Sequence, residues 1–253
     1  LAVTACGNDA KDDTKTETKI ETSQVEESKN QAESSVIYAS FYPIYNLTRQ
    51  IAGDKFDVKA FNSLTTESHD FEPSAKEIAE LSKSQLIFMN GAGMEDWKDD
   101  VEETVDITMV DTSEGLDLLK ADHDHEDADH EDHDHEEGDE HDHDHEEGEE
   151  EGHHHHGEFD PHTWLSPVNA KAQAKVIADK LIEIDPANKD YYEKNYQKIA
   201  SEFDEIINEY KDKFNQVTNK KFIVPHEAFG YVARDFGLEQ IPLASLTSTA
   251  DPD

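Results

Sequence analysis

The segment from Ala121 to Glu158 constrains the fold most, because nothing in it can contribute to a hydrophobic core. It holds 20 Asp or Glu residues, no Lys or Arg, and 12 of the chain's 15 histidines. Asp-His and His-Glu pairs repeat along it without any periodic apolar face. A segment of this composition cannot bury enough apolar surface to offset the entropy of ordering. We therefore predict a disordered insertion that interrupts the ordered fold.

The chain as a whole attracts cations. Its 61 acidic and 22 basic residues give a formal net charge of -39 over 253 residues, and the insertion carries about half of that excess. A charge of this sign and size repels nucleic acid and anionic membrane surfaces. We therefore exclude nucleic acid as a partner.

The only cysteine, Cys6, follows an apolar start and a run of small residues, and a polar run follows it. This pattern resembles the end of a bacterial lipoprotein signal peptide, whose Cys is lipidated and becomes the mature N-terminus. We expect residues 1–6 to be the remainder of a signal that begins upstream, and residues 7–35 to be a disordered stalk. No other stretch approaches the roughly 18 apolar residues of a membrane span. The prediction is a protein attached by lipid to the extracytoplasmic face of the cell membrane.

From Val36 onward, segments typical of strands alternate with segments typical of helices. Strands are predicted at 36–41, 56–61, 86–89 and 107–110. The intervening helices include one that starts with a capping box at Ser74 and one from Glu95 to Thr104. This order predicts an α/β fold with a parallel sheet covered by helices on both faces. We assign residues 36–186 to an N-terminal lobe, with ligands expected at the carboxyl ends of its strands.

Beyond Pro186, apolar residues step by three or four positions from Tyr192 to Val217. The spacing predicts one amphipathic helix of about 30 residues, which would be about 45 Å long. We interpret residues 187–218 as a helix that joins two lobes; the alternative is a long helix packed along one domain. A strand, a helix and a further strand then begin a C-terminal lobe at 219–253, which the sequence does not complete.

Three histidines lie outside the insertion: His69, His162 and His226. A lone histidine is more often a surface residue or a satisfied core residue than a ligand. Here, however, all three lie at strand ends or in loops next to predicted helix starts. Zinc takes three or four ligands, and imidazole is its commonest nitrogen ligand in a chain without cysteines to spare. We therefore predict a metal site built from these three residues.

The segments around these histidines, His69–Ser74, Asp160–Pro167 and His226–Tyr231, resemble the three metal-binding motifs of the zinc-binding solute-binding proteins of bacterial ABC importers, the ZnuA-like group. The resemblance runs from about Val36 to Asp253 and includes the acidic histidine-rich insertion. It implies two α/β lobes joined by a long helix, with His69, His162 and His226 as zinc ligands between them. Members complete the site from the second lobe with a carboxylate or a water, but no fourth protein ligand can be assigned here.

The resemblance implies a monomeric extracytoplasmic receptor that binds Zn²⁺ and delivers it to the membrane permease of an ABC importer, and not an enzyme. A manganese receptor of the same family is one alternative, although three imidazoles favour zinc. A surface adhesin is another. The third is a zinc hydrolase with Glu227 as general base, which the absence of an HExxH motif disfavours.

The clustered histidines of the insertion are interpreted as an auxiliary group that collects metal weakly. Their affinity is expected to be low because ordering the segment costs roughly 1 to 2 kcal/mol per residue. The alternative is a solvated acidic insertion with no metal role. The residues concerned are His123, His125, His130, His133, His135, His141, His143, His145, His153, His154, His155 and His156.

Overall fold

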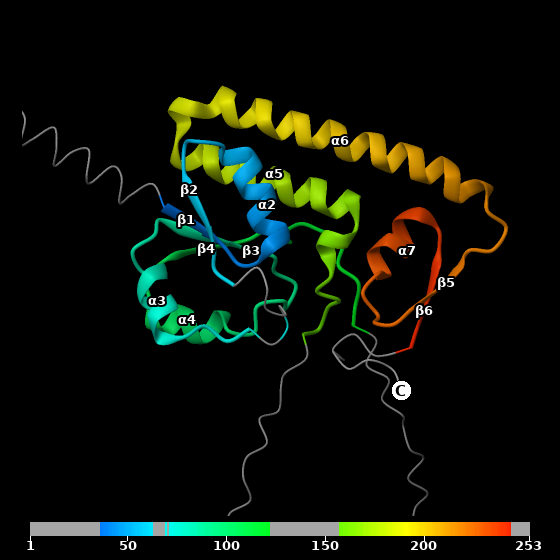
Figure 1. Cartoon of the computed structure of the whole chain (residues 1–253), viewed down its shortest axis with the longest axis horizontal. Helices are drawn as coiled ribbons and strands as arrows, with labels where there is room; N and C mark the ends of the chain where they lie inside the picture. The colour runs from blue at the N-terminus through cyan, green and yellow to red at the C-terminus, as the bar shows by residue number, and fades with distance from the viewer. Residues whose placement is uncertain (1–35, 63–68, 70, 122–156, 244–253) are drawn as a thin grey trace, which may run out of the picture.

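A computed structural model of the chain describes residues 36–62, 69, 71–121 and 157–243. Four strands form a sheet in the order β2-β1-β3-β4 (Figure 1). The strands are β1 (Val36–Ala39), β2 (Asp57–Ala60), β3 (Leu86–Met89) and β4 (Thr108–Asp111). All three neighbouring pairs are parallel, which confirms the predicted α/β class.

Side chains of the central strands alternate between two hydrophobic clusters on opposite faces of the sheet. On one face, Ile37, Leu86 and Phe88 pack with α2 (Tyr42–Ala52), α5 (Pro167–Ile184) and α6 (Lys189–Gln216). On the other face, Tyr38, Ile87 and Met89 pack with α3 (Ala75–Leu81) and α4 (Lys98–Thr104). Both faces are therefore covered, which explains why β3 is a continuous apolar run.

Side-chain hydrogen bonds to the backbone determine where helices α3 and α4 begin. Before α3, the Ser74 hydroxyl accepts from the backbone N–H of Glu77, whose carboxylate accepts from the backbone N–H of Ser74 at 2.8 Å. This is the predicted capping box. The helix that was expected to start at Glu95 instead begins at Lys98. The Glu95 carboxylate is turned inward, where it accepts from the backbone N–H groups of Asn90 and Gly91.

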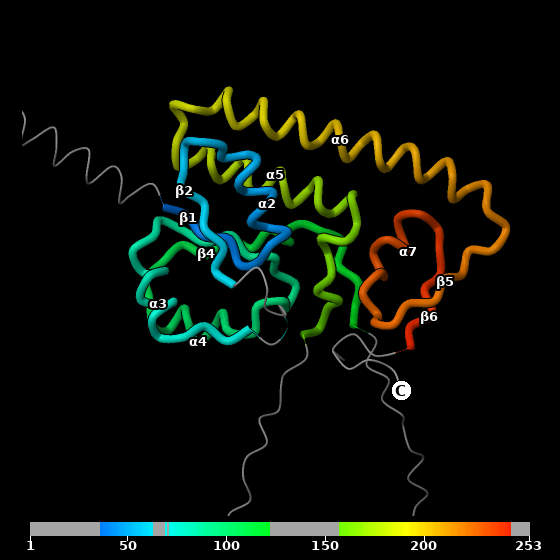
Figure 2. The backbone as a smooth tube through the Cα atoms, in the orientation of Figure 1, coloured from blue at the N-terminus to red at the C-terminus, as the bar shows by residue number. Residues whose placement is uncertain are grey.

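The long helix α6 has 28 residues, close to the predicted length, and the short 3-10 helix η2 (Pro186–Asn188) precedes it. Its first half packs against the four-stranded unit through Tyr192 and Ile199. At its far end, the ring of Phe214 lies 5.5 Å from that of Phe236 in α7 (Gly230–Phe236). Helix α6 thus runs from the four-stranded unit to the last unit of the chain (Figure 2).

That last unit contains two parallel strands, β5 (Lys221–Val224) and β6 (Glu239–Pro242), joined through α7. Helix α7 ends at Phe236 and is followed by Gly237, whose φ of 65° is a left-handed conformation that favours glycine. We refer to these elements as the two-stranded unit. Residues 1–35, which include Cys6 and the expected stalk, and residues 122–156 of the insertion lie outside the described residues. Among the helices that are described, none is both long and apolar enough to cross a membrane.

Candidate metal site

The structure brings the three predicted histidines together from three separate loops. His69 lies between β2 and α3, His162 directly precedes the 3-10 helix η1 (Thr163–Leu165), and His226 lies between β5 and α7. The Nε2 atom of His162 is 3.1 Å from Nε2 of His69 and 3.1 Å from Nε2 of His226. One possible ligand atom from each residue lies within 4.8 Å of the others.

These separations suit one zinc ion. Two nitrogens that each lie about 2.05 Å from a tetrahedral zinc are about 3.3 Å apart. Both distances to His162 are close to that value, so a small adjustment of the rings would place all three nitrogens around one ion. The site also lies at the expected edge, because His69 follows β2 in the loop at its carboxyl end.

Asp160 orients the central imidazole. One oxygen of its carboxylate, Oδ1, lies 2.8 Å from Nδ1 of His162 and also accepts from the backbone N–H of His162 at 2.9 Å. A carboxylate accepts hydrogen bonds, so this contact places the ring proton of a neutral His162 on Nδ1. The lone pair of Nε2 then points toward the other two histidines, as a metal ligand requires. Both residues are almost fully buried, at 3% exposure each.

Aromatic packing holds the same loop from the other side. The ring of Trp164 lies 5.4 Å from that of His162 and meets Phe41 edge to face at 4.7 Å. Because Phe41 belongs to the core of the four-stranded unit, this contact fixes the loop of His162 to the sheet. Because of this packing, we expect the loop to keep its shape independently of metal.

The two-stranded unit is attached directly to this loop. Tyr231 of α7 is fully buried, and its hydroxyl donates to the backbone carbonyl of Asp160 at 2.6 Å. Burial is the main cause that raises the pKa of Tyr231 to about 12, so the hydroxyl keeps its proton and remains a donor. A side chain at Gly230 would come within 2.9 Å of the Asp160 carboxylate. Helix α7, and with it the loop of His226, is therefore held close to His162.

Sequence reasoning missed the polar residues beneath the site. Asn90, Thr112 and Gln173 are buried side by side below the loop of His162, joined by hydrogen bonds. Asn90 and Thr112 directly follow β3 and β4, so a polar residue immediately after an apolar strand is the signal that could have found them. No such signal marks Gln173, which lies within a helix.

Nearby, the turn after β3 depends on glycine. Gly91 has a φ of 81°, and a side chain there would collide with the carboxylate of Asp111. Glu95 closes the turn from below, and burial is the main cause that raises the pKa of its carboxyl group to about 7. Asp111, a second acidic group, raises the same pKa further.

The insertion leaves and rejoins the fold next to this site. Lys120 and Phe159 form an antiparallel bridge, and the backbone N–H of Ala121 donates to the carbonyl of Glu158 at 3.1 Å. Two residues further along each strand of the bridge, the backbone N–H of Asp160 donates to the carbonyl of Leu119 at 2.9 Å. The two ends of the insertion are therefore joined within two residues of the Asp160 carboxylate. The loop histidines themselves lie outside the described residues.

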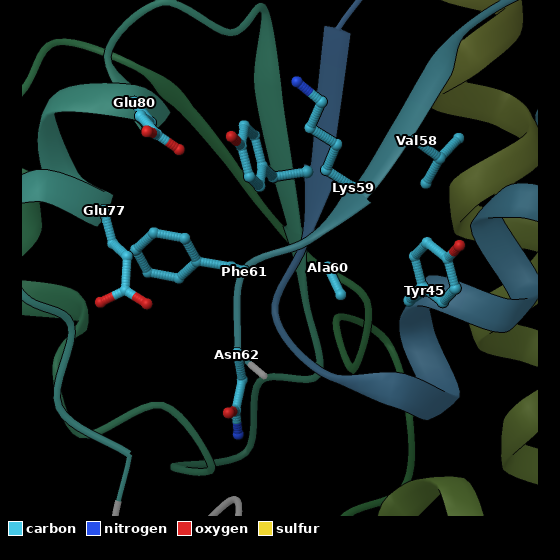
Figure 3. Close-up of a pocket in the computed structure, with 9 residues that line it drawn as sticks. Tyr45, Val58, Lys59, Ala60, Phe61, Asn62, Glu77 and Glu80 are labelled. Carbon is cyan, nitrogen blue, oxygen red and sulfur yellow. The ribbon is translucent and has the colours of Figure 1, made fainter. Parts of the chain in front are cut away.

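A separate pocket lies along β2 and is not part of the metal site. Figure 3 shows Tyr45 of α2, Lys59 of β2, and Glu77 and Glu80 of α3 around it. None of the three histidines lines this pocket. Glu77 is already engaged in the capping box of α3, so the pocket shows no built ligand site.

The fold and the site together define a two-lobed α/β solute-binding protein in which a histidine cluster lies where the two units meet. The family model described as "Zinc-uptake complex component A periplasmic" matches residues 37–253. The chain belongs to this family. The resemblance inferred from the three motifs is therefore confirmed.

Among curated proteins, the chain is 36% identical over 219 residues to the high-affinity zinc uptake system protein ZnuA of Bacillus subtilis. That match covers 85% of this chain and 63% of the relative. It is 35% identical over 225 residues to the zinc-binding lipoprotein AdcA of Streptococcus pneumoniae, with 85% of this chain and 40% of the relative covered. The chain thus spans less than two thirds of the length of either relative.

Among solved structures, the fold is similar to the Zn(II)-bound ZnuA-like domain of Streptococcus pneumoniae AdcA. The TM-score is 0.65 at 28% sequence identity, and the match covers 83% of this chain and 66% of the other. The family is one of transport receptors and not of enzymes.

Proposed function

We propose that this chain belongs to an extracytoplasmic receptor that binds Zn²⁺ and delivers it to the membrane permease of an ABC importer. The observation that carries the proposal is the convergence of His69, His162 and His226, with their Nε2 atoms directed at one another. The relatives support it, because they are named for zinc uptake and zinc binding.

In this proposal the three imidazoles are the protein ligands of the transported ion. Nitrogen donors favour zinc over manganese, which prefers carboxylate, carbonyl and water ligands. Asp160 holds His162 in the tautomer that can bind metal, and Tyr231 keeps the loop of His226 within reach. A ligand set already assembled by the fold loses little entropy on binding, which suits a receptor that scavenges a scarce ion.

The remaining parts of the proposal concern the membrane and the insertion. Lipidation of Cys6 would hold the receptor at the extracytoplasmic face of the membrane, close to the permease. The lipoprotein name of the Streptococcus pneumoniae relative supports this location. The histidines of the insertion would collect Zn²⁺ weakly beside the site. The hydrogen bond between Ala121 and Glu158 supports this, because it joins the two ends of the insertion close to Asp160. We propose that the receptor acts as a monomer.

The proposal is tested by titrating the full-length protein with Zn²⁺ and Mn²⁺ in chelator competition. We expect one tight Zn²⁺ equivalent and weaker binding of Mn²⁺. His162→Ala, which removes the central ligand, should weaken the tight equivalent at least about tenfold while circular dichroism stays unchanged. A matched control is His130→Ala in the insertion, which should leave the tight equivalent in place. An unchanged affinity in His162→Ala would remove this residue from the site, and tighter Mn²⁺ binding would assign the receptor to manganese.

A further inference from the structure

A cluster of four buried polar side chains lies beneath His162. Asn90, Thr112, Thr163 and Gln173 are each fully buried, with 0% of their surface exposed. They come from four separate segments: the ends of β3 and β4, the helix η1, and the helix α5. Burying a polar group is costly unless it is hydrogen-bonded, so a cluster of this kind is stable only when its members satisfy one another.

The hydrogen bonds of Asn90 allow only one orientation of its amide. The Nδ2 group lies 2.8 Å from the carbonyl oxygen of Pro161 and 2.9 Å from that of Gly91, and carbonyl oxygens only accept. The Oδ1 atom therefore accepts, from the Thr163 hydroxyl at 2.8 Å and from Nε2 of Gln173 at 3.0 Å. One side chain thus binds the residue on each side of His162.

We propose that Asn90 is a positioning residue for the metal site, which fixes the backbone of His162 by binding Pro161 and Thr163. This inference rests on the proposed zinc-binding function. Asn90 makes no hydrogen bond to His162 itself and acts through the two flanking residues. By holding both of them, it restricts the backbone angles that aim Nε2 of His162 at the other two histidines.

Asn90 is itself held in place from below. Its backbone N–H donates to Oε1 of Glu95 at 2.7 Å, and the next N–H, of Gly91, donates to Oε2 at 2.9 Å. Gln173 bonds to Thr112 at 3.0 Å as well as to Asn90, which ties the cluster to the end of β4. These hydrogen bonds to the residues that flank His162 are made without metal, although Oε1 of Gln173 is buried with no hydrogen-bond partner within the described part of the chain. Metal binding therefore does not have to order this loop.

The sharpest test compares two substitutions of Thr163 in the full-length protein. Thr163→Val keeps the shape of the side chain but removes the hydroxyl that donates to Asn90. Thr163→Ser keeps the hydroxyl and removes only a methyl group. If the hydrogen bond positions His162, Thr163→Val should weaken Zn²⁺ binding about tenfold. Thr163→Ser should lose clearly less affinity.

Asn90→Ala removes the side-chain hydrogen bonds to both Pro161 and Thr163, and should weaken Zn²⁺ binding at least as much as Thr163→Val. The matched control is Thr48→Val, because Thr48 is equally buried, lies in α2, and has no hydroxyl partner within the described part of the chain. It should bind Zn²⁺ like the wild type. The absorption spectrum of the Co²⁺-loaded protein also reports the geometry of the ligands, and it does not change when only the overall stability changes. We expect this spectrum to change in Asn90→Ala and Thr163→Val only.

The outcomes separate the two proposals. If the wild type binds Zn²⁺ tightly and both Asn90→Ala and Thr163→Val keep its affinity and Co²⁺ spectrum, Asn90 has no positioning role. Equal losses in Thr163→Val and Thr163→Ser would also overturn the inference, since packing would then explain them. If Asn90→Ala does not fold, the comparison of the two Thr163 variants decides. A wild type without a tight Zn²⁺ equivalent would overturn the proposed function and this inference with it.

Discussion

At the scale of single residues, the charge on Asp160 matters as much as its geometry. Its carboxylate accepts from both the backbone and the ring of His162, and it is buried at 3% exposure. In the proposed site, Zn²⁺ at Nε2 would place positive charge on the imidazole, and a carboxylate at Nδ1 would stabilise that charge better than a neutral amide would.

Asp160→Asn should therefore lower the Zn²⁺ affinity about tenfold to hundredfold while the protein stays folded. Asp111→Asn is a matched control, because Asp111 also accepts from a backbone N–H two residues on, that of Ser113 at 2.7 Å, but is not one of the residues that converge on the candidate metal site. Chelator competition measures both affinities. Equal affinity losses in the two variants would show that the effect is a general one of turn stability.

Local sequence patterns were enough to single out the three histidines but not Asn90. His69, His162 and His226 could be predicted because histidines outside the insertion are rare and each follows a recognisable loop pattern. The side chain of Asn90 also binds Gly91, but its partners near His162 and in α5 lie 71 to 83 residues away along the chain. Only the folded packing of β3 against η1 and α5 brings them together, so no local pattern could reveal them.

At the scale of elements, strand and helix positions were predictable wherever one periodic pattern dominated. Helix α6 was predicted because its apolar residues repeat over 28 residues, and β3 because it is apolar throughout. The start of α4 was wrong by three residues. Glu95 has a high helix propensity. However, the hydrogen bonds that its carboxylate accepts from two buried N–H groups in the turn after β3 stabilise the fold more than one further helical residue would.

The buried Glu95 carboxyl group should make stability depend on pH. Its pKa is raised from 4.5 to about 7, mainly by burial. Between these values the unfolded chain releases the proton and the folded protein keeps it, so rising pH favours unfolding. A shift of this size corresponds to at most about 3 kcal/mol, which is present below about pH 4.5 and lost above about pH 7.

Glu95→Gln removes this titrating group and should flatten the profile. We expect the stability of the wild type, relative to that of Glu95→Gln, to fall by up to about 3 kcal/mol as pH rises from 4.5 to 7.5. Urea unfolding of both proteins at several pH values, with a chelator present to remove metal, measures the difference. Parallel profiles would show that Glu95 does not keep its proton in the folded protein.

At the scale of the whole molecule, helix α6 and a group of polar contacts fix how the four-stranded and two-stranded units sit around the site. Helix α6 spans them on one side, and the bond from Tyr231 to the Asp160 carbonyl joins them at the site itself. On the same helix as Tyr231, Asp235 accepts from the Ser166 hydroxyl that caps α5, and Arg234 donates to the Asp117 carbonyl at 2.5 Å. The histidine cluster therefore rests on a junction with several polar contacts.

The described ends of the insertion are joined to each other, so the residues between them can be removed in one step. Ala121 and Glu158 are already hydrogen-bonded to each other, so a short Gly-Ser linker can replace residues 122–156 without pulling the ends apart. The variant lacks all 12 clustered histidines and keeps His69, His162 and His226. Shortening a loop of this length reduces the entropic cost of closing it, so stability should rise by about 1 to 2 kcal/mol or stay unchanged.

If the insertion only collects metal, the variant should lose several weak Zn²⁺ equivalents and keep one tight equivalent. Calorimetric titration of both proteins measures this, at the same ionic strength because salt screens the attraction between Zn²⁺ and the acidic residues. The difference in cellular zinc uptake should appear chiefly when zinc is scarce, since local supply limits loading only then. Loss of the tight equivalent would mean that a residue of the insertion is a ligand. The three-histidine site would then need a fourth member from that segment.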